Sequence, residues 1–106
     1  MALSGCNTVT SIPTGEIATA ESAIQNAQET SAYDSVELRS AMEKLEQAKQ
    51  AVKAENYQQA KWLAEQASVD AELAEAKAEA ITAREATDSL RYSIKTLNQE
   101  IDDIRY

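Results

Sequence analysis

Residues 57–80, YQQAKWLAEQASVDAELAEAKAEA, decide the fold of this chain. The stretch has no glycine or proline and is rich in alanine, the residue with the highest helix propensity. Apolar residues recur along it at steps of three and four, from Tyr57 through Ala60 to Ile81, which is the spacing of one helix face. The sequence therefore predicts a long helix, and glycine and proline stay absent to its end at Tyr106.

A second apolar row shares this predicted helix. Its C-terminal part, here called the distal seam, consists of Thr87, Leu90, Ile94, Leu97, Ile101 and Ile104. Traced backward, the row passes Leu73, Val69 and Trp62, which gives the first half of the helix a wide apolar face. A wide face suits a helix with two neighbours, whereas a narrow one suits a single coiled-coil partner. We therefore expect the first half to pack in a bundle and the second half to project.

Two shorter helices are predicted before the long one. The first follows Pro13 over residues 14–30, with Thr14 as its N-cap and an apolar stripe of Ile17, Ala20, Ile24 and Ala27. The second covers residues 35–55, where Asp34 and Glu37 have the spacing of a capping box. Its core-facing residues are expected to be Leu38, Met42, Leu45 and Val52, with Ala41 and Ala48 widening the face.

These patterns predict an all-α fold: an antiparallel three-helix bundle whose long C-terminal helix projects as a coiled coil. Residues 1–12 are expected to be a lipobox remnant and flexible linker, and residues 13–106 a single helical domain with helices at about 14–30, 35–55 and 57–105. Asn56 is the expected cap of the third helix, and Tyr57 is expected to plug the turn before it. A helix break near Asp88 remains an alternative to one continuous helix.

The most specific motif is Leu3-Ser4-Gly5-Cys6, an aliphatic residue and two small residues before the single cysteine. This order is typical of a lipobox, in which Cys6 becomes the acylated first residue and anchors the protein to a membrane. A chance cysteine in a cytoplasmic tail is the alternative. The residues before Leu3 contain no apolar run, so we expect most of the signal peptide to be absent, leaving an unlipidated, soluble chain with Cys6 as a free thiol.

The chain also resembles the small proteobacterial lipoproteins grouped as the DUF4398 family. The resemblance covers residues 3 to about 86 and is carried by PTGEI at 13–17, by SVEL at 35–38 and by the alanine-rich run from Leu63 to Ala83. It implies a helical architecture and an envelope location, with no assigned reaction. By resemblance to lipoprotein sorting, Asn7 after the cysteine favours the periplasmic face of the outer membrane.

An enzyme is not expected. The chain has no histidine, and its only cysteine lies outside the predicted helices, which excludes Cys/His catalysis and Cys/His metal sites. No glycine-rich phosphate loop occurs, and we predict no cofactor and no metal. The net charge of −8 argues against nucleic acid as a partner.

The predicted function is therefore that of a non-catalytic, outer-membrane-anchored periplasmic lipoprotein that acts as an envelope structural or protein-interaction module. The alternative is a soluble, tetratricopeptide-like domain that binds a peptide between its helices. The expected partners are the membrane, through lipidated Cys6 only, and an envelope or cell-wall-associated protein. A weak parallel homodimer through the distal seam is a further expectation, because branched residues at a positions with leucine at d favour parallel pairs. Against it stands the alternative that residues 90–104 fold back or merely pack against neighbours in a crystal.

Overall fold

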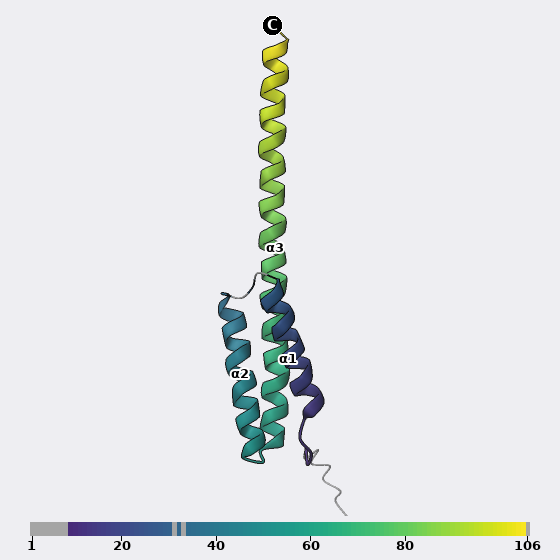
Figure 1. Ribbon diagram of the computed structural model, residues 1–106, viewed down its shortest axis with the longest axis vertical. Coiled ribbons are helices and arrows are strands. Elements are labelled where there is room, and N and C mark those ends of the chain that lie inside the picture. The colour runs from purple at the N-terminus through teal and green to yellow at the C-terminus, as the bar shows by residue number, and fades with distance from the viewer. Residues whose placement is uncertain (1–8, 31, 33, 106) are drawn as a thin grey trace, which may run out of the picture.

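The computed structural model describes residues 9–30, 32 and 34–105 of the chain. Three helices make up the fold: α1 (Thr14–Glu29), α2 (Val36–Lys53) and α3 (Tyr57–Ile104). Figure 1 shows α1 and α2 lying beside the first half of α3, which then continues alone to the C-terminus. The prediction of an all-helical fold with three helices and a long C-terminal helix is confirmed, and no strand occurs in the described ranges.

Side-chain pairs between the helices give their directions. On α2, Ser40 and Lys44 both contact Asp70 of α3, and Glu37, earlier on α2, pairs with Lys77, later on α3. Earlier residues of α2 therefore contact later residues of α3, so the two helices run in opposite directions. Figure 1 shows α1 running the same way as α3, so the chain passes up, down and up again.

The bundle core is built mainly of alanine. On α3 the fully buried face consists of Ala60, Ala64, Ala67, Ala71 and Ala74, each with no exposed surface. Alanines of α1 and α2 meet this face, which lets the helix axes approach at or below the usual spacing of about 8–10 Å. Leu38 is the one large side chain that is fully buried among the described residues. The buried apolar area is therefore small for the length of the chain.

The core stripe of α2 differs from the prediction. Met42 is 47% exposed, and Val52 is only half-buried, whereas Ala41 and Ala48 have no exposed surface. The observed stripe steps by three and four through Leu38, Ala41, Leu45 and Ala48. Because the opposing face of α3 is alanine, the small residues of α2 lie at the closest approach and the longer Met42 is turned outward.

Two of the three helix starts also differ from expectation. Ser35, rather than Asp34, caps α2, and its hydroxyl accepts a hydrogen bond from the Leu38 amide at 3.0 Å. The helix begins at Val36, so the residue with extended backbone at the cap position is the serine. At α1 the cap position is Pro13, without a side-chain hydrogen bond, and Thr14 lies inside the helix. Asn56 caps α3 as predicted by accepting from the Gln59 amide.

The turn between α2 and α3 contains a strained residue. Glu55 has a φ of 57°, a left-handed conformation that costs a non-glycine residue about 1–2 kcal/mol. In return, the amides of Glu55 and Asn56 donate to the carbonyls of Val52 and Ala51 at 3.0 and 2.8 Å. This pair of bonds is a Schellman ending, which satisfies the last carbonyls of α2. The chain thus reverses within three residues and brings α2 against the start of α3.

Candidate functional site

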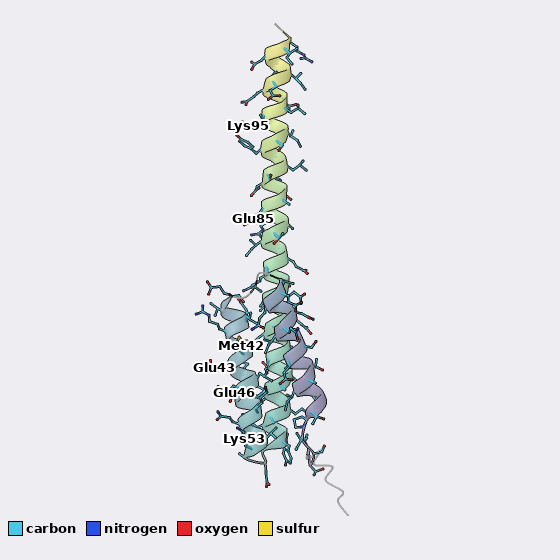
Figure 2. The ribbon with its side chains drawn as sticks, in the orientation of Figure 1. Met42, Glu43, Glu46, Lys53, Glu85 and Lys95 are labelled. Atoms are coloured by element: carbon cyan, nitrogen blue, oxygen red, sulfur yellow. The ribbon has the colours of Figure 1, made fainter. Side chains whose placement is uncertain are left out.

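The distal seam lies on a part of α3 that no other helix touches. From Ile81 to Arg105 every residue is exposed except Thr96, which is half-buried. Leu90 and Leu97 are 62% and 56% exposed, although leucine is a residue that folded proteins normally bury. Figure 2 shows the side chains of this part, among them Glu85 and Lys95, spreading outward with no neighbouring helix. The alternative that residues 90–104 fold back is wrong, and so is a helix break near Asp88.

The apolar row of α3 is also exposed where α3 lies beside α1 and α2. The prediction that the first half of α3 buries a wide apolar face is therefore wrong. Trp62, Val69 and Leu73 are 54%, 58% and 45% exposed. Both α1 and α2 pack on the alanine face of α3 instead, because small residues allow two helices to fit closely on one side of it. We call Trp62, Val69, Leu73, Ala76, Ala80 and Ala83 the proximal row; all six are exposed. It continues directly into the distal seam.

The one hydroxyl in the distal seam is satisfied within the helix. Thr87 donates its hydroxyl hydrogen to the Ala83 carbonyl, four residues earlier, at 2.9 Å. Thr82 and Ser93, on neighbouring positions, donate to backbone carbonyls in the same way. These groups need no partner from outside α3, so an apolar helix could cover the seam without leaving them unsatisfied.

A polar cluster joins α2 to α3 on one flank of the proximal row. Asp70 accepts hydrogen bonds from the Ser40 hydroxyl at 2.8 Å and from the Lys44 ammonium at 2.6 Å. Burial by itself would raise the pKa of Asp70, but these two bonds outweigh it and hold the pKa below its ordinary value. Glu37 has a lowered pKa as well, chiefly because Lys77 donates a hydrogen bond to it.

Acid is therefore expected to loosen the α2–α3 contact. Because the folded-state pKa values of Asp70 and Glu37 lie below their unfolded values, their stabilising contribution is present above about pH 4 and is lost as the pH falls through the folded pKa. The melting temperature should fall over this range, and it should fall less for Asp70→Asn. Circular dichroism melts from pH 7 to 2 measure this. Glu46→Gln, on the outer side of α2, should retain the wild-type pH profile (Figure 2).

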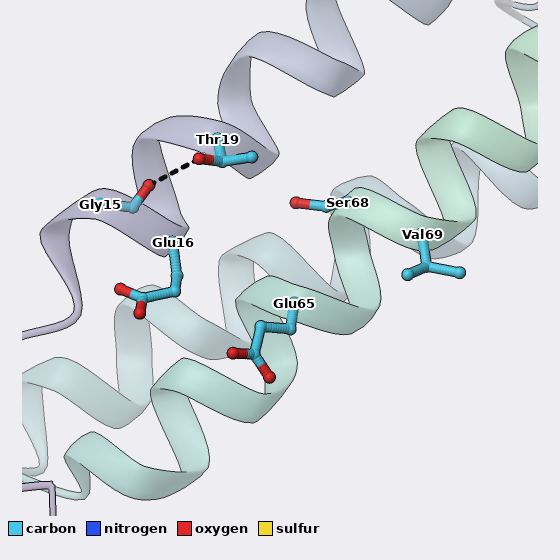
Figure 3. A pocket seen from close by; sticks show the side chains of 6 residues that line it. All are labelled: Gly15, Glu16, Thr19, Glu65, Ser68 and Val69. Atoms are coloured by element: carbon cyan, nitrogen blue, oxygen red, sulfur yellow. Dashed lines mark hydrogen bonds between the residues drawn. The ribbon is translucent and has the colours of Figure 1, made fainter.

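A shallow groove of about 480 Å³ lies between α1 and α3. Figure 3 shows Glu16 and Glu65 on its two sides, with the Thr19 hydroxyl bonded to the Gly15 carbonyl at 2.9 Å. Ser68 donates to the Ala64 carbonyl, so both hydroxyls at the groove are already engaged within their own helices. The groove offers two carboxylates and little else that could orient a ligand.

The two remaining predicted residues differ in what the structure says of them. Tyr57 is the first residue of α3 and is half-buried beside the turn, as a plug would be, although its hydroxyl forms no hydrogen bond with another residue that the structure describes. Cys6 and its lipobox lie outside the described residues. Across residues 9–30, 32 and 34–105, acidic side chains form no group that could hold a metal ion, and no helix is long and apolar enough to cross a membrane.

A comparison with protein families matches residues 15–90 to a domain of unknown function, DUF4398. The chain belongs to the DUF4398 family. The match spans α1, α2 and α3 as far as Leu90, the first leucine of the distal seam, so the bundle and the beginning of the projecting part are both family features. Neither the curated proteins nor the solved structures contain a match to this chain.

Proposed function

We propose that this DUF4398 protein is a non-catalytic lipoprotein of the outer membrane, held through Cys6 on the periplasmic face, and that its projecting helix is an interaction module. The observation that carries the proposal is the distal seam. Exposed rows of leucine and isoleucine are unfavourable in water, and a contiguous row of this kind is typical of a surface that meets a partner.

The placement of the termini supports this role. The Glu16 carboxylate, near the start of α1, has an oxygen 3.9 Å from the Lys61 Nζ, near the start of α3. The linker before α1 therefore enters the bundle at the end opposite the distal seam. From Lys61 to Ile104 the helix extends about 65 Å at the usual rise of 1.5 Å per residue. A chain tethered through its N-terminus would therefore hold the distal seam well away from the membrane surface, where a partner within the envelope can reach it.

The alternative of a tetratricopeptide-like peptide-binding domain finds less support. Such domains bind in a concave surface formed by several helix pairs, and a stable array needs about three repeats. Here α2 and α3 make one hairpin, and their shared face is filled by alanine and Leu38 rather than open. The groove in Figure 3 lies between α1 and α3 instead, and its charged groups are the carboxylates of Glu16 and Glu65.

The anchor is tested by substitution of Cys6 in the native organism. The full-length protein should incorporate labelled fatty acid and fractionate with the outer membrane, and Cys6→Ala should lose both properties. The physical reason is that acyl chains supply the membrane affinity, about 0.8 kcal/mol per buried methylene. Ser4→Thr, which keeps a small polar residue in the motif, is the matched control. Outer-membrane fractionation of Cys6→Ala would rule the anchor out.

A further inference from the structure

The proximal row and the distal seam form one largely apolar stripe along α3, which is interrupted by Gln66 between Trp62 and Val69 and contains Thr87. In heptad notation, with Leu90 and Leu97 at d, the stripe continues backward at d through Val69 to Trp62 and at a through Leu73. It runs about 63 Å from Trp62 to Ile104 at the usual helical rise. This is six heptads, whereas three to four sustained heptads with charged flanks already indicate a coiled coil.

The two flanks of the stripe carry opposite charges. The g positions include Glu65, Glu72, Glu79 and Glu100, and the e positions include Lys77, Arg84, Arg91 and Arg105. All eight of these residues are exposed. Charges at e and g flank the contact of a coiled coil and determine which partner is accepted and in which direction it runs.

We propose that the occupant of this stripe is a second copy of the chain, parallel and in register along the whole of α3. In a parallel pair, a g residue faces the e residue five positions later on the other helix. That rule sets Glu72 against Lys77, Glu79 against Arg84 and Glu100 against Arg105, each in both directions across the dimer. In an antiparallel pair, g residues face g residues and e residues face e residues, so none of these three acid–base pairs can form.

The remaining flank positions agree with this arrangement. Ala86 and Ser93 face Arg91 and Asn98, which are neutral combinations. Glu65 faces Asp70, the one like-charged pair, but Asp70 is already held by Ser40 and Lys44 on its own α2. Lys77 is likewise already paired with Glu37 on its own α2, so Glu79–Arg84 is the pair of otherwise unengaged charges beside the alanines of the proximal row, where apolar burial is smallest. Ion pairing between the two chains thus stabilises the part of the stripe that buries the least apolar area.

The bundle leaves room for the second copy. The helices α1 and α2 pack on the buried face of α3, which lies opposite the stripe. The proximal row therefore stays exposed although α1 and α2 cover the other side of α3. The dimer deepens the interaction role proposed above by naming the partner. It forms in solution without any lipid, so the dimer and the Cys6 anchor can each fail without the other.

Disulfide cross-linking tests direction and register. In the full chain with Cys6→Ser, single substitutions Val69→Cys and Leu97→Cys place a cysteine at d positions four heptads apart. Both should oxidise to covalent dimers, because identical d residues face each other only in a parallel, in-register pair. Tyr92→Cys, on the outer face of α3, should form about tenfold less dimer.

Three outcomes of the cross-linking overturn the proposal. Cross-linking of Leu97→Cys alone limits the contact to the distal seam. A disulfide between Leu73→Cys and Leu97→Cys chains in a mixture, without self-linking of either, makes the pair antiparallel, because a residues face d residues in that arrangement. The absence of dimer from both variants removes the pair altogether.

Sedimentation over a concentration series tests the stripe and its charges. Ile94→Asp should raise the dimer dissociation constant about 100-fold or more, since it buries two unpaired carboxylates, while Tyr92→Asp leaves it unchanged. Glu79→Lys should raise the constant about tenfold, and adding Arg84→Glu should restore it, because the reversed pair attracts again. Equal dissociation constants for Glu79→Lys and the wild type overturn the assignment of orientation to these charges.

Discussion

Leu38→Ala is expected to destabilise the bundle by about 2–5 kcal/mol, the usual cost of removing a buried leucine. Leu38 is 1% exposed and belongs to the cluster in which α1, α2 and α3 all meet. Alanine neighbours cannot extend into the cavity, because they have no side chain beyond the β carbon. The site therefore has little means of relaxing, and the cost should lie in the upper part of that range.

Chemical denaturation followed by circular dichroism measures this effect. Met42→Ala, which removes a side chain of similar size from an exposed position of the same helix, is the matched control and should change stability by less than about 1 kcal/mol. Equal losses from the two variants would mean that Leu38 is not the centre of the core. Because single domains are stable by only about 5–15 kcal/mol, Leu38→Ala should be partly unfolded at room temperature if the wild type lies at the low end.

The second large effect comes from adding volume rather than removing it. Ala67→Leu or Ala74→Leu should destabilise the bundle by about 1–3 kcal/mol, because neither position has any exposed surface and each would have to take up three more carbon atoms where the helices pack closely. For a domain of this size each kcal/mol corresponds to about 4–8 °C in melting temperature. The helices must separate to admit the larger side chain, which also breaks neighbouring alanine contacts.

Thermal melts of the leucine variants check this directly. Ala86→Leu makes the same substitution on the projecting part of α3, where the residue is exposed, and should leave the melting temperature nearly unchanged. A melting temperature above that of the wild type for Ala74→Leu would mean that the alanine face is accessible and that the packing described above is incorrect.

Much of this fold follows from local sequence. The alanine row of α3 and the stripe of α1 are visible as steps of three and four, and the Asn56 cap has the spacing that its hydrogen bond requires. The three helices begin and end within two residues of the expected positions. The family was also recognisable from the sequence, chiefly through the alanine-rich run from Leu63 to Ala83, which lies inside the matched residues 15–90.

The errors concern which of two apolar faces is buried. Trp62, Val69 and Leu73 are larger and more hydrophobic than the alanines beside them, so a count of apolar residues favours burying them. The structure buries the alanines instead, since close approach of two helices depends on small side chains. For the same reason Ala41 is buried on α2, whereas Met42 is exposed. A periodic pattern identifies the apolar faces of a helix, but the packing of the neighbouring helices determines which of those faces is buried.

The functional part depended on a feature that periodicity alone does not disclose. The distal seam and its projection beyond the bundle were predicted from the sequence, but the exposure of the proximal row is visible only once α1 and α2 are seen to pack on the alanine face of α3. The charged flanks at Glu72 and Lys77 are present in the sequence. These charges become informative once the proximal row is known to be exposed. Charges beside a buried row could not contact a second chain and so could not determine which chain binds.

The alanine core has a consequence for how stability depends on temperature. The heat-capacity change of unfolding grows with the apolar surface that unfolding exposes, and a core of Ala67, Ala71 and Ala74 exposes little of it. Freezing alanine also costs no side-chain entropy. The free energy of unfolding should therefore follow a shallow curve, with a low maximum and a slow decline toward both cold and heat. Such a bundle tolerates wide swings in temperature with little change in its modest stability.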